Sequence, residues 1–206
     1  MEKIEYRIAK TITYLFHPIF LPLYCLLLLF NLKSFFSFGI VLNARLMLIG
    51  FVVITTIIFP LIIVFLMKRQ GLIQSYLMET RQERRYPYLI IAVFYFLTYN
   101  IFRQLQLPDI YTFYMMGATF LVIVVIIINI WWKISIHMVG IGGVFGIVAG
   151  LSLNMSLDLM FPIMVIILIA GLVGYARLKL NSHKPSEIYT GFFVGAIIML
   201  GIFCFL

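Results

Sequence analysis

The chain has 206 residues, of which 64% are hydrophobic and only 11% are charged, and its formal net charge at pH 7 is +8. Soluble domains are about 45–50% apolar and about 25% charged, so this composition excludes a water-soluble globular protein and indicates an integral membrane protein. The basic residues lie in short segments between apolar runs and not on one continuous face, so the positive charge does not indicate nucleic-acid binding.

Apolar runs long enough to cross a bilayer follow one another along the chain, because a transmembrane helix needs about 20 mostly apolar residues. They predict an all-α fold, a polytopic membrane helical bundle of six to seven transmembrane helices that forms a single integral membrane domain over residues 1–206. The predicted spans are 11–32, 44–67, 87–105, 110–132, 134–153, 157–175 and 188–206.

Proline interrupts the first predicted span. The pair His17-Pro18, and then Pro22, are expected to break it, because proline lacks the backbone donor that a continuous helix needs. Residues 1–16 are alternatively an amphipathic helix on the membrane surface. The basic residues that share one face of that helix are Lys3, Arg7 and Lys10.

Basic residues gather at one edge of the predicted spans. The segments 68–86, 133 and 176–187 are separated from one another by even numbers of crossings, so they face the same side of the membrane, and we count residues 1–10 with them. Two explanations of this basic edge are open. Cytoplasmic loops of membrane proteins are rich in Lys and Arg, and the same residues could form an anion-binding site. The basic residues expected on the opposite side are Lys33, Arg45 and Arg103.

Two of the three histidines fall at this basic edge, where ionisable groups are costly unless they are used. A neutral imidazole can attack phosphorus if an acceptor holds its other ring nitrogen, and Glu187 is one helical turn from His183. Pro185 suits the first turn of a helix, which places His183 near a helix start that favours anions. His137, if protonated, can give a proton to a leaving oxygen, and Arg177 can bind phosphoryl oxygens.

The segment with Arg177 and His183 resembles the third motif of the type 2 phosphatidic acid phosphatase (PAP2) superfamily. That family carries Lys-x6-Arg-Pro, then Pro-Ser-Gly-His, then Ser-Arg-x5-His-x3-Asp. The third motif here reads Ala176-Arg177-x5-His183-x3-Glu187, with the arginine, the histidine and the acid at the family's spacing. The resemblance covers about residues 79–206.

The other two motifs depart further from the family pattern. The second reads Ile134-Ser135-Ile136-His137, which keeps the serine and the histidine and loses the proline and the glycine. The first is degenerate within residues 79–88, which hold no lysine at the family's distance. Its candidate residues are Arg81, Arg84, Arg85 and Pro87.

The resemblance implies a PAP2-like core and a metal-independent lipid phosphatase that uses no cofactor. His183 would be the nucleophile that forms a phosphohistidine, Glu187 the acid that orients it, and His137 the general acid. The substrate would be a lipid phosphate or an isoprenyl diphosphate whose tail stays in the bilayer. The phosphate-binding residues would be Arg177, Arg81, Arg84, Arg85 and Ser135.

The departures from the motifs keep a second function open. Ile136 replaces the glycine that lets backbone approach the phosphate, Ala176 replaces a serine donor, and Glu187 is longer than the family's aspartate by one methylene. The alternative is a non-catalytic PAP2-like membrane subunit that binds lipid phosphates or assembles a complex. A transporter is disfavoured, because the predicted spans hold few charges at mid-depth.

The expected partners are membrane lipids and an amphipathic lipid-phosphate substrate, with no nucleic acid and no protein partner that the sequence identifies. We expect a bacterial inner membrane. The excess of Lys and Arg places the basic edge in the cytoplasm, whereas the resemblance places the site on the periplasmic or extracytoplasmic side.

Glycines in the fifth and seventh predicted spans recur at the three- and four-residue spacings that let membrane helices approach closely. Contact between these two spans would bring His137 and His183 together, since both lie near the same ends of their helices. The glycines are Gly140, Gly142, Gly143, Gly146 and Gly150 in the fifth span and Gly191 and Gly195 in the seventh.

Overall fold

The computed structural model of the chain describes residues 2–32, 40–74, 76 and 80–205. These residues form helices and turns and no strand, which confirms the all-α fold. They divide into two compact units, unit 1 (Met1–Leu21 and Lys133–Leu206) and unit 2 (Pro22–Trp132), and we describe each by itself. Whether the chain forms a single domain stays a prediction. Lys33, and residue 79 at the start of the degenerate first motif, lie outside the described residues.

Six helical segments of the described ranges are long and apolar enough to cross a membrane, so the chain is an integral membrane protein. A further helix, α6 (Arg81–Gln104), is of comparable length but begins with a charged turn, and it is not among the six. The number of helices agrees with the expected six to seven. The six segments are Lys3–Asn31, Leu42–Arg69, Asp109–Trp131, Ile136–Asn154, Met160–Lys179 and Pro185–Cys204.

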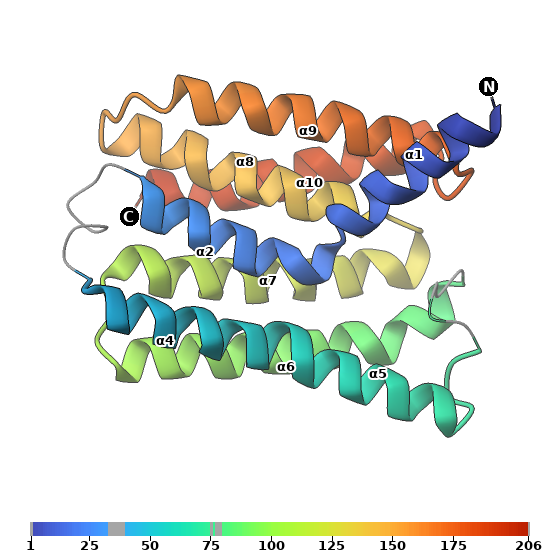
Figure 1. The fold of residues 1–206 in the computed structure, drawn as a ribbon, viewed down its shortest axis with the longest axis horizontal. Helices are drawn as coiled ribbons and strands as arrows, with labels where there is room; N and C mark the ends of the chain where they lie inside the picture. Colours follow the sequence, from blue (N-terminus) through green and yellow to red (C-terminus); the bar gives the residue numbers. More distant parts are fainter. Residues whose placement is uncertain (1, 33–39, 75, 77–79, 206) are drawn as a thin grey trace. The chain divides into compact units, whose positions relative to one another are not determined.

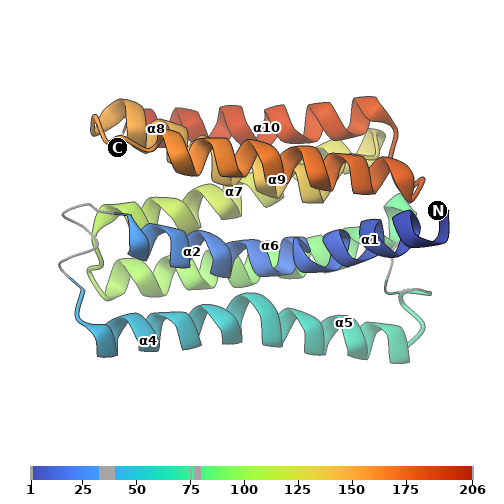
Figure 2. The same ribbon diagram turned by 45° about the horizontal axis from the view of Figure 1, so that its top comes forward.

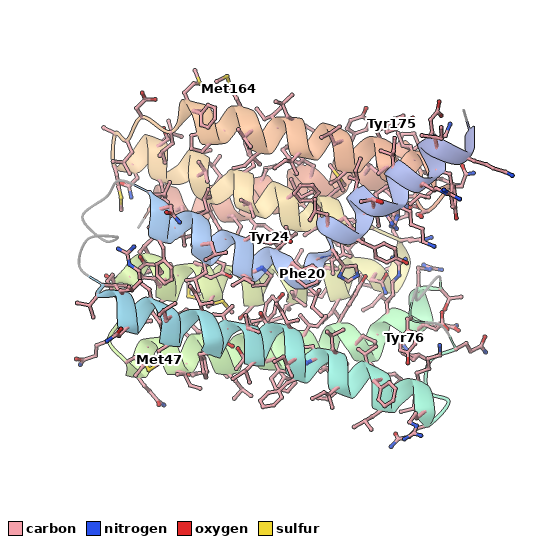
Figure 3. The ribbon with its side chains drawn as sticks, viewed as in Figure 1. Phe20, Tyr24, Met47, Tyr76, Met164 and Tyr175 are labelled. Carbon is pink, nitrogen blue, oxygen red and sulfur yellow. The ribbon has the colours of Figure 1, made fainter. Side chains whose placement is uncertain are left out.

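Unit 1 is a set of neighbouring helices from the two ends of the chain. Figure 1 shows α8, α9 and α10 running side by side in alternating directions, and α1 lies against α9 in both views (Figure 2). An ion pair between Lys179 and Glu5 joins α9 to α1. Met164 and Tyr175 project outward from α9 (Figure 3) and are about half exposed. The elements are α1 (Glu2–Leu15), η1 (Pro18–Phe20), α8 (Ile136–Asn154), α9 (Met160–Lys179) and α10 (Pro185–Cys204).

Glycines hold α8 and α10 in backbone contact, as the sequence predicts. A Cβ atom added at Gly142 would lie 2.0 Å from the carbonyl oxygen of Phe192, and one at Gly195 would lie 2.0 Å from the carbonyl oxygen of Val139. Such distances leave no room for a side chain, so each glycine is required by the approach of the opposite backbone. The contact therefore fixes α8 and α10 against each other along their length.

The expected break at His17-Pro18 is confirmed. Helix α1 ends at Leu15, and His17 caps the short helix η1, with its Nδ1 accepting a hydrogen bond of 3.3 Å from the backbone N–H of Ile19. The expected break at Pro22 is wrong: Pro22 lies in the first turn of α2 (Leu21–Asn31), where the missing N–H costs nothing.

Unit 2 consists of α2, the long segment α4 (Leu42–Val52), η2 (Val53–Ile58) and α5 (Phe59–Arg69), and the packed pair α6 and α7 (Asp109–Trp131). The middle segment η2 is a π-helix inside the span Leu42–Arg69. The hydroxyl of Thr98 on α6 donates to the hydroxyl of Thr55 on η2 at 2.9 Å, and both side chains are buried.

The start of α6 is fixed by its own capping groups and by the end of α7. Thr80 and Glu83 form a capping box at the first turn. The guanidinium of Arg81 donates to the carbonyl oxygens of Ile130 and Trp131, which are among the last carbonyls of α7. Arg81 therefore satisfies acceptors that the end of a helix leaves without intrahelical donors.

Candidate functional site

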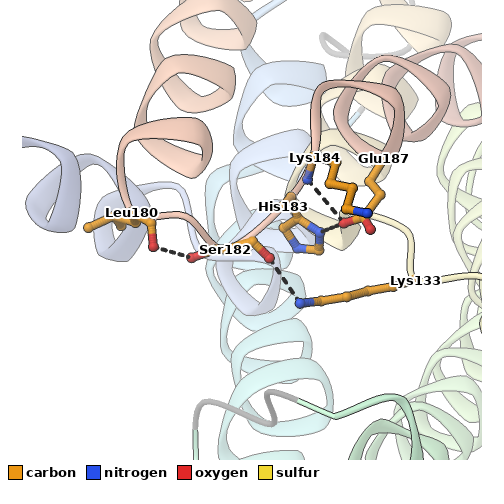
Figure 4. Close-up of polar contacts among 6 residues, drawn as sticks. All are labelled: Lys133, Leu180, Ser182, His183, Lys184 and Glu187. Atoms are coloured by element: carbon orange, nitrogen blue, oxygen red, sulfur yellow. Dashed lines mark hydrogen bonds and ion pairs between the residues drawn. The ribbon is translucent and has the colours of Figure 1, made fainter.

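His183 and Glu187 form a buried pair at the start of α10. The last turn of α9 leads through Asn181, whose φ is +49°, to the N-cap residue Lys184. The Nδ1 of His183 lies 2.7 Å from Glu187 Oε2, and the Lys184 backbone N–H donates to the same oxygen at 3.3 Å (Figure 4). The expected contact is thus present, and the carboxylate holds the imidazole in one orientation.

The start of α8 lies against the start of α10. The backbone N–H of Ser135 donates to the carbonyl oxygen of Glu187 at 3.2 Å, and a Cβ at Gly191 would lie 2.8 Å from the Ser135 carbonyl oxygen. Ser135 is the N-cap of α8 and is fully buried, but its hydroxyl makes no cap hydrogen bond and finds no partner in the described part of the chain. A serine at this position ordinarily caps its helix, so the hydroxyl remains available for a ligand.

His137 lies at the centre of a cluster of basic side chains. It is buried, and its ring meets the ring of His17 edge to face, with 5.4 Å between centroids and 85° between planes. Arg177, His17 and His183 lie close enough for their charges to act on it, and the Thr13 backbone is next to it. We call His17, His137, His183 and Arg177 the histidine cluster.

Arg177, at the end of α9, and Lys133, before α8, both lie at this end of unit 1. Arg177 is in the last turn of α9, and its carbonyl oxygen accepts from the Ser182 backbone N–H at 3.1 Å. Lys133 Nζ donates to the Ser182 carbonyl oxygen at 3.0 Å (Figure 4). The structure therefore brings together Arg177, His137 and His183 as expected, and within unit 1 the basic residues of separate segments share one end.

His17 is a member of the cluster that the sequence did not predict. Its place before Pro18 indicated only a break in the helix. The chain holds three histidines, and all three meet here. The available signal was a polar side chain in an apolar run, which is costly in a membrane unless the side chain is used.

The three arginines of the degenerate first motif lie on the first two turns of α6, in unit 2. Arg84 is buried and Arg85 is exposed, whereas Arg81 is engaged with the end of α7. Their part in binding phosphate stays a prediction.

The donor set of the cluster suits an anion. Imidazole and guanidinium N–H groups donate to phosphoryl oxygens, and in the described ranges no group of three or more His, Cys, Asp and Glu is placed to hold a metal ion. Comparison with protein-family models, with curated proteins and with solved structures finds no match to this chain. The resemblance to the PAP2 superfamily therefore rests on the motif residues alone.

Proposed function

We propose that the chain is a membrane-embedded, metal-independent lipid phosphatase of PAP2 type, which acts on a lipid phosphate or an isoprenyl diphosphate in a bacterial inner membrane. The observation that carries the proposal is the gathering of all three histidines and Arg177 at one end of unit 1, with Glu187 bonded to one of the imidazoles. Ionisable groups in a membrane protein are costly to keep, so their gathering at one place indicates that they are used.

The reaction would proceed in two displacements at phosphorus. Nε2 of His183 attacks the phosphorus atom, the bond from phosphorus to the leaving oxygen breaks, and His137 gives that oxygen a proton. Water then attacks the phosphohistidine, the nitrogen–phosphorus bond breaks, His137 takes a proton from the water, and inorganic phosphate leaves. Glu187 accepts from Nδ1 of His183 throughout, which stabilises the positive charge on the phosphorylated ring.

Arg177 and Ser135 would hold the phosphoryl group. The guanidinium gives two parallel donors to phosphoryl oxygens, and the buried Ser135 hydroxyl gives a third. A proton on His137 places a second positive charge beside Arg177. A bound phosphoryl dianion offsets both charges, so His137 takes up its proton together with the substrate.

Phosphate release from a panel of lipid phosphates tests this proposal. Purified protein in detergent, with EDTA present, is expected to release inorganic phosphate from at least one of phosphatidic acid, phosphatidylglycerophosphate and an isoprenyl diphosphate. His183→Ala should abolish release, and Ser186→Ala, at an exposed position three residues away, should leave it intact. Equal rates for the wild type and His183→Ala would contradict the proposal.

The pH dependence of turnover gives a second test. His183 must be unprotonated to attack phosphorus, so the rate should fall in acid. His137 must carry a proton to help the leaving group, so the rate should also fall in base, and the profile of kcat should be bell-shaped. A rate that rises steadily with pH would remove His137 from the acid role.

The second candidate function is a subunit that binds a lipid phosphate without turnover. Ile136 and Ala176 favour it: the first occupies the family's glycine position, and the second is fully buried where the family has a hydroxyl donor. Arg177→Ala would then weaken lipid-phosphate binding, whereas His183→Ala would change it little. Binding without release for every substrate in the panel would favour this function.

A further inference from the structure

His17 is the histidine that no motif accounts for. It sits in the bend between α1 and η1, half-buried, with its ring against the ring of His137 and within reach of the Arg177 charge. The bend determines this position. If the helix continued through Pro18, residue 17 would follow the helical path of α1 and its side chain would point elsewhere.

The hydrogen bond to Ile19 fixes the tautomer of His17. Nδ1 accepts from the backbone N–H of Ile19, so Nδ1 carries no proton and the neutral ring carries its proton on Nε2. The outer ring nitrogen is therefore a neutral hydrogen-bond donor at the edge of the histidine cluster. It differs in this from His183, whose Nδ1 faces the carboxylate of Glu187 and whose Nε2 would be the nucleophile.

We infer that His17 is a phosphate-contacting residue that donates from Nε2–H to a phosphoryl oxygen beside Arg177 and His137. The inference rests on the proposed function, since it assigns a third imidazole to the same phosphate site. It makes the N-terminal helix of unit 1 part of that site. A neutral donor binds the phosphoryl group without adding to the positive charge of the cluster.

Two substitutions separate this role from helix capping. Asn places its side-chain oxygen where Nδ1 of histidine lies, so His17→Asn keeps the cap on Ile19 and loses the outer donor. Gln places its amide N–H group where Nε2–H lies, so His17→Gln keeps the donor and loses the cap. Inorganic phosphate and orthovanadate are the probes, measured by calorimetry on the full chain in detergent, with Tm measured on the same samples.

The inference expects phosphate affinity to fall roughly tenfold or more in His17→Asn, as for a hydrogen bond to a charged group, and to stay near the wild-type value in His17→Gln. Tm should instead fall in His17→Gln, which loses the cap on Ile19, and stay near the wild-type value in His17→Asn, which keeps it. Wild-type affinity in His17→Asn would overturn the inference, and so would equal weakening in both variants, because His17 would then act through ring packing on His137. If the wild type binds neither probe, the proposed function and this inference both fail.

A second observation, independent of the histidine cluster, concerns the face that α1 shares with α9. A hollow of about 560 Å³ is lined by one face of α1 and the end of α9, and we call it the basic hollow. Glu5 is the carboxylate that pairs with one of its cations. The lining residues are Lys3, Tyr6, Arg7, Lys10 and Lys179.

The hollow combines positive charge with a membrane-facing helix. Ile4 and Ile8 on α1 are exposed, as expected for a helix whose apolar side contacts lipid. Its volume is in the range of sites that hold small ligands, about 300–1,000 Å³. We propose that the basic hollow binds the headgroup of an anionic phospholipid from the surrounding bilayer, because basic residues beside a membrane attract anionic lipids.

A charge-matched pair of double variants tests this site. Lys3→Gln/Arg7→Gln removes two cations from the hollow, and Lys68→Gln/Arg69→Gln removes two from the end of α5. After purification from mixed phosphatidylglycerol and phosphatidylcholine nanodiscs, native mass spectrometry should find bound phosphatidylglycerol reduced at least several-fold in the first variant only. Equal reduction in both variants, no reduction, or displacement of the lipid by inorganic phosphate would overturn the proposal.

Discussion

The helix pair α8–α10 in unit 1 and the pair α6–α7 in unit 2 are packed by different means. In α8–α10 the glycines bring backbone against backbone, with Gly142 at Phe192 and Gly195 at Val139. In α6–α7 the buried residues are mostly large, among them several tyrosines, and the helix ends are joined through Arg81. Backbone contact leaves little freedom to slide, so it sets the position of the start of α8, which carries His137, against the start of α10, which His183 precedes.

The largest effect should come from the polar end of the glycine-packed pair. Glu187→Gln replaces the acceptor of His183 Nδ1 with a group that can present an N–H, which turns the imidazole into the wrong tautomer. We expect phosphate release to fall by roughly 10²- to 10⁴-fold, with little change in Tm. The matched control is Glu83→Gln at the same N3 position of the capping box of α6; Gln keeps such a box, so phosphate release and Tm should both stay near the wild-type values. A rate loss as large in the control would show that both pairs serve the reaction.

A methyl group inside the backbone contact should cost stability. In Gly195→Ala the new Cβ would lie 2.0 Å from the Val139 carbonyl oxygen and 2.7 Å from the Gly143 nitrogen. We expect a loss of about 1–3 kcal/mol, as for overpacking in a core, together with reduced activity. Gly201→Ala on the same helix meets nothing within 4 Å and should be neutral or slightly stabilising. Unfolding in SDS followed by circular dichroism measures both, and equal stability of the two variants would refute the contact.

In unit 2 the ends of α6 and α7 are joined by the side chain of Arg81, and removing it should lower stability by less than Gly195→Ala does. Arg81→Ala leaves the Ile130 and Trp131 carbonyl oxygens without this donor, for an expected loss of about 1–2 kcal/mol. Arg103→Ala, at an exposed position in the last turn of α6, is the control and should stay within about 0.5 kcal/mol of the wild type. A phosphate affinity that falls in Arg81→Ala with no loss of stability would instead make Arg81 a ligand-binding residue.

The smallest effect is expected at the hydroxyl pair of unit 2. Thr98→Val removes the hydrogen bond to Thr55, and such bonds between membrane helices contribute about 0.6 kcal/mol on average. Thr119→Val removes only a bond to Met115 in its own helix. The difference between these two variants in the same unfolding assay isolates the interhelical bond. No difference between them would mean that side-chain volume alone holds this pair.

Local patterns predicted much of unit 1. Glycine spacing predicted the contact of α8 with α10, and a four-residue separation predicted that Glu187 would reach His183. The contact of His17 with His137 could not be predicted, because it depends on the direction that the chain takes at the bend between α1 and η1. The use of Arg81 to cap α7 was missed for a similar reason: the partner carbonyls lie 49 and 50 residues away in the sequence.

The π-helix η2 has a consequence for the length of its span. Pro60 lacks the N–H that a regular helix would use, and the hydroxyls of Thr55 and Thr56 donate to the carbonyl oxygens of Phe51 and Val52 within this stretch. A π-helical turn holds one residue more than an α-helical turn, so this stretch takes up a surplus residue without rotating the faces that α4 and α5 present. Deleting Ile58 would remove that residue and leave Met67 on its buried face, so this stretch is where the span accepts a change of length.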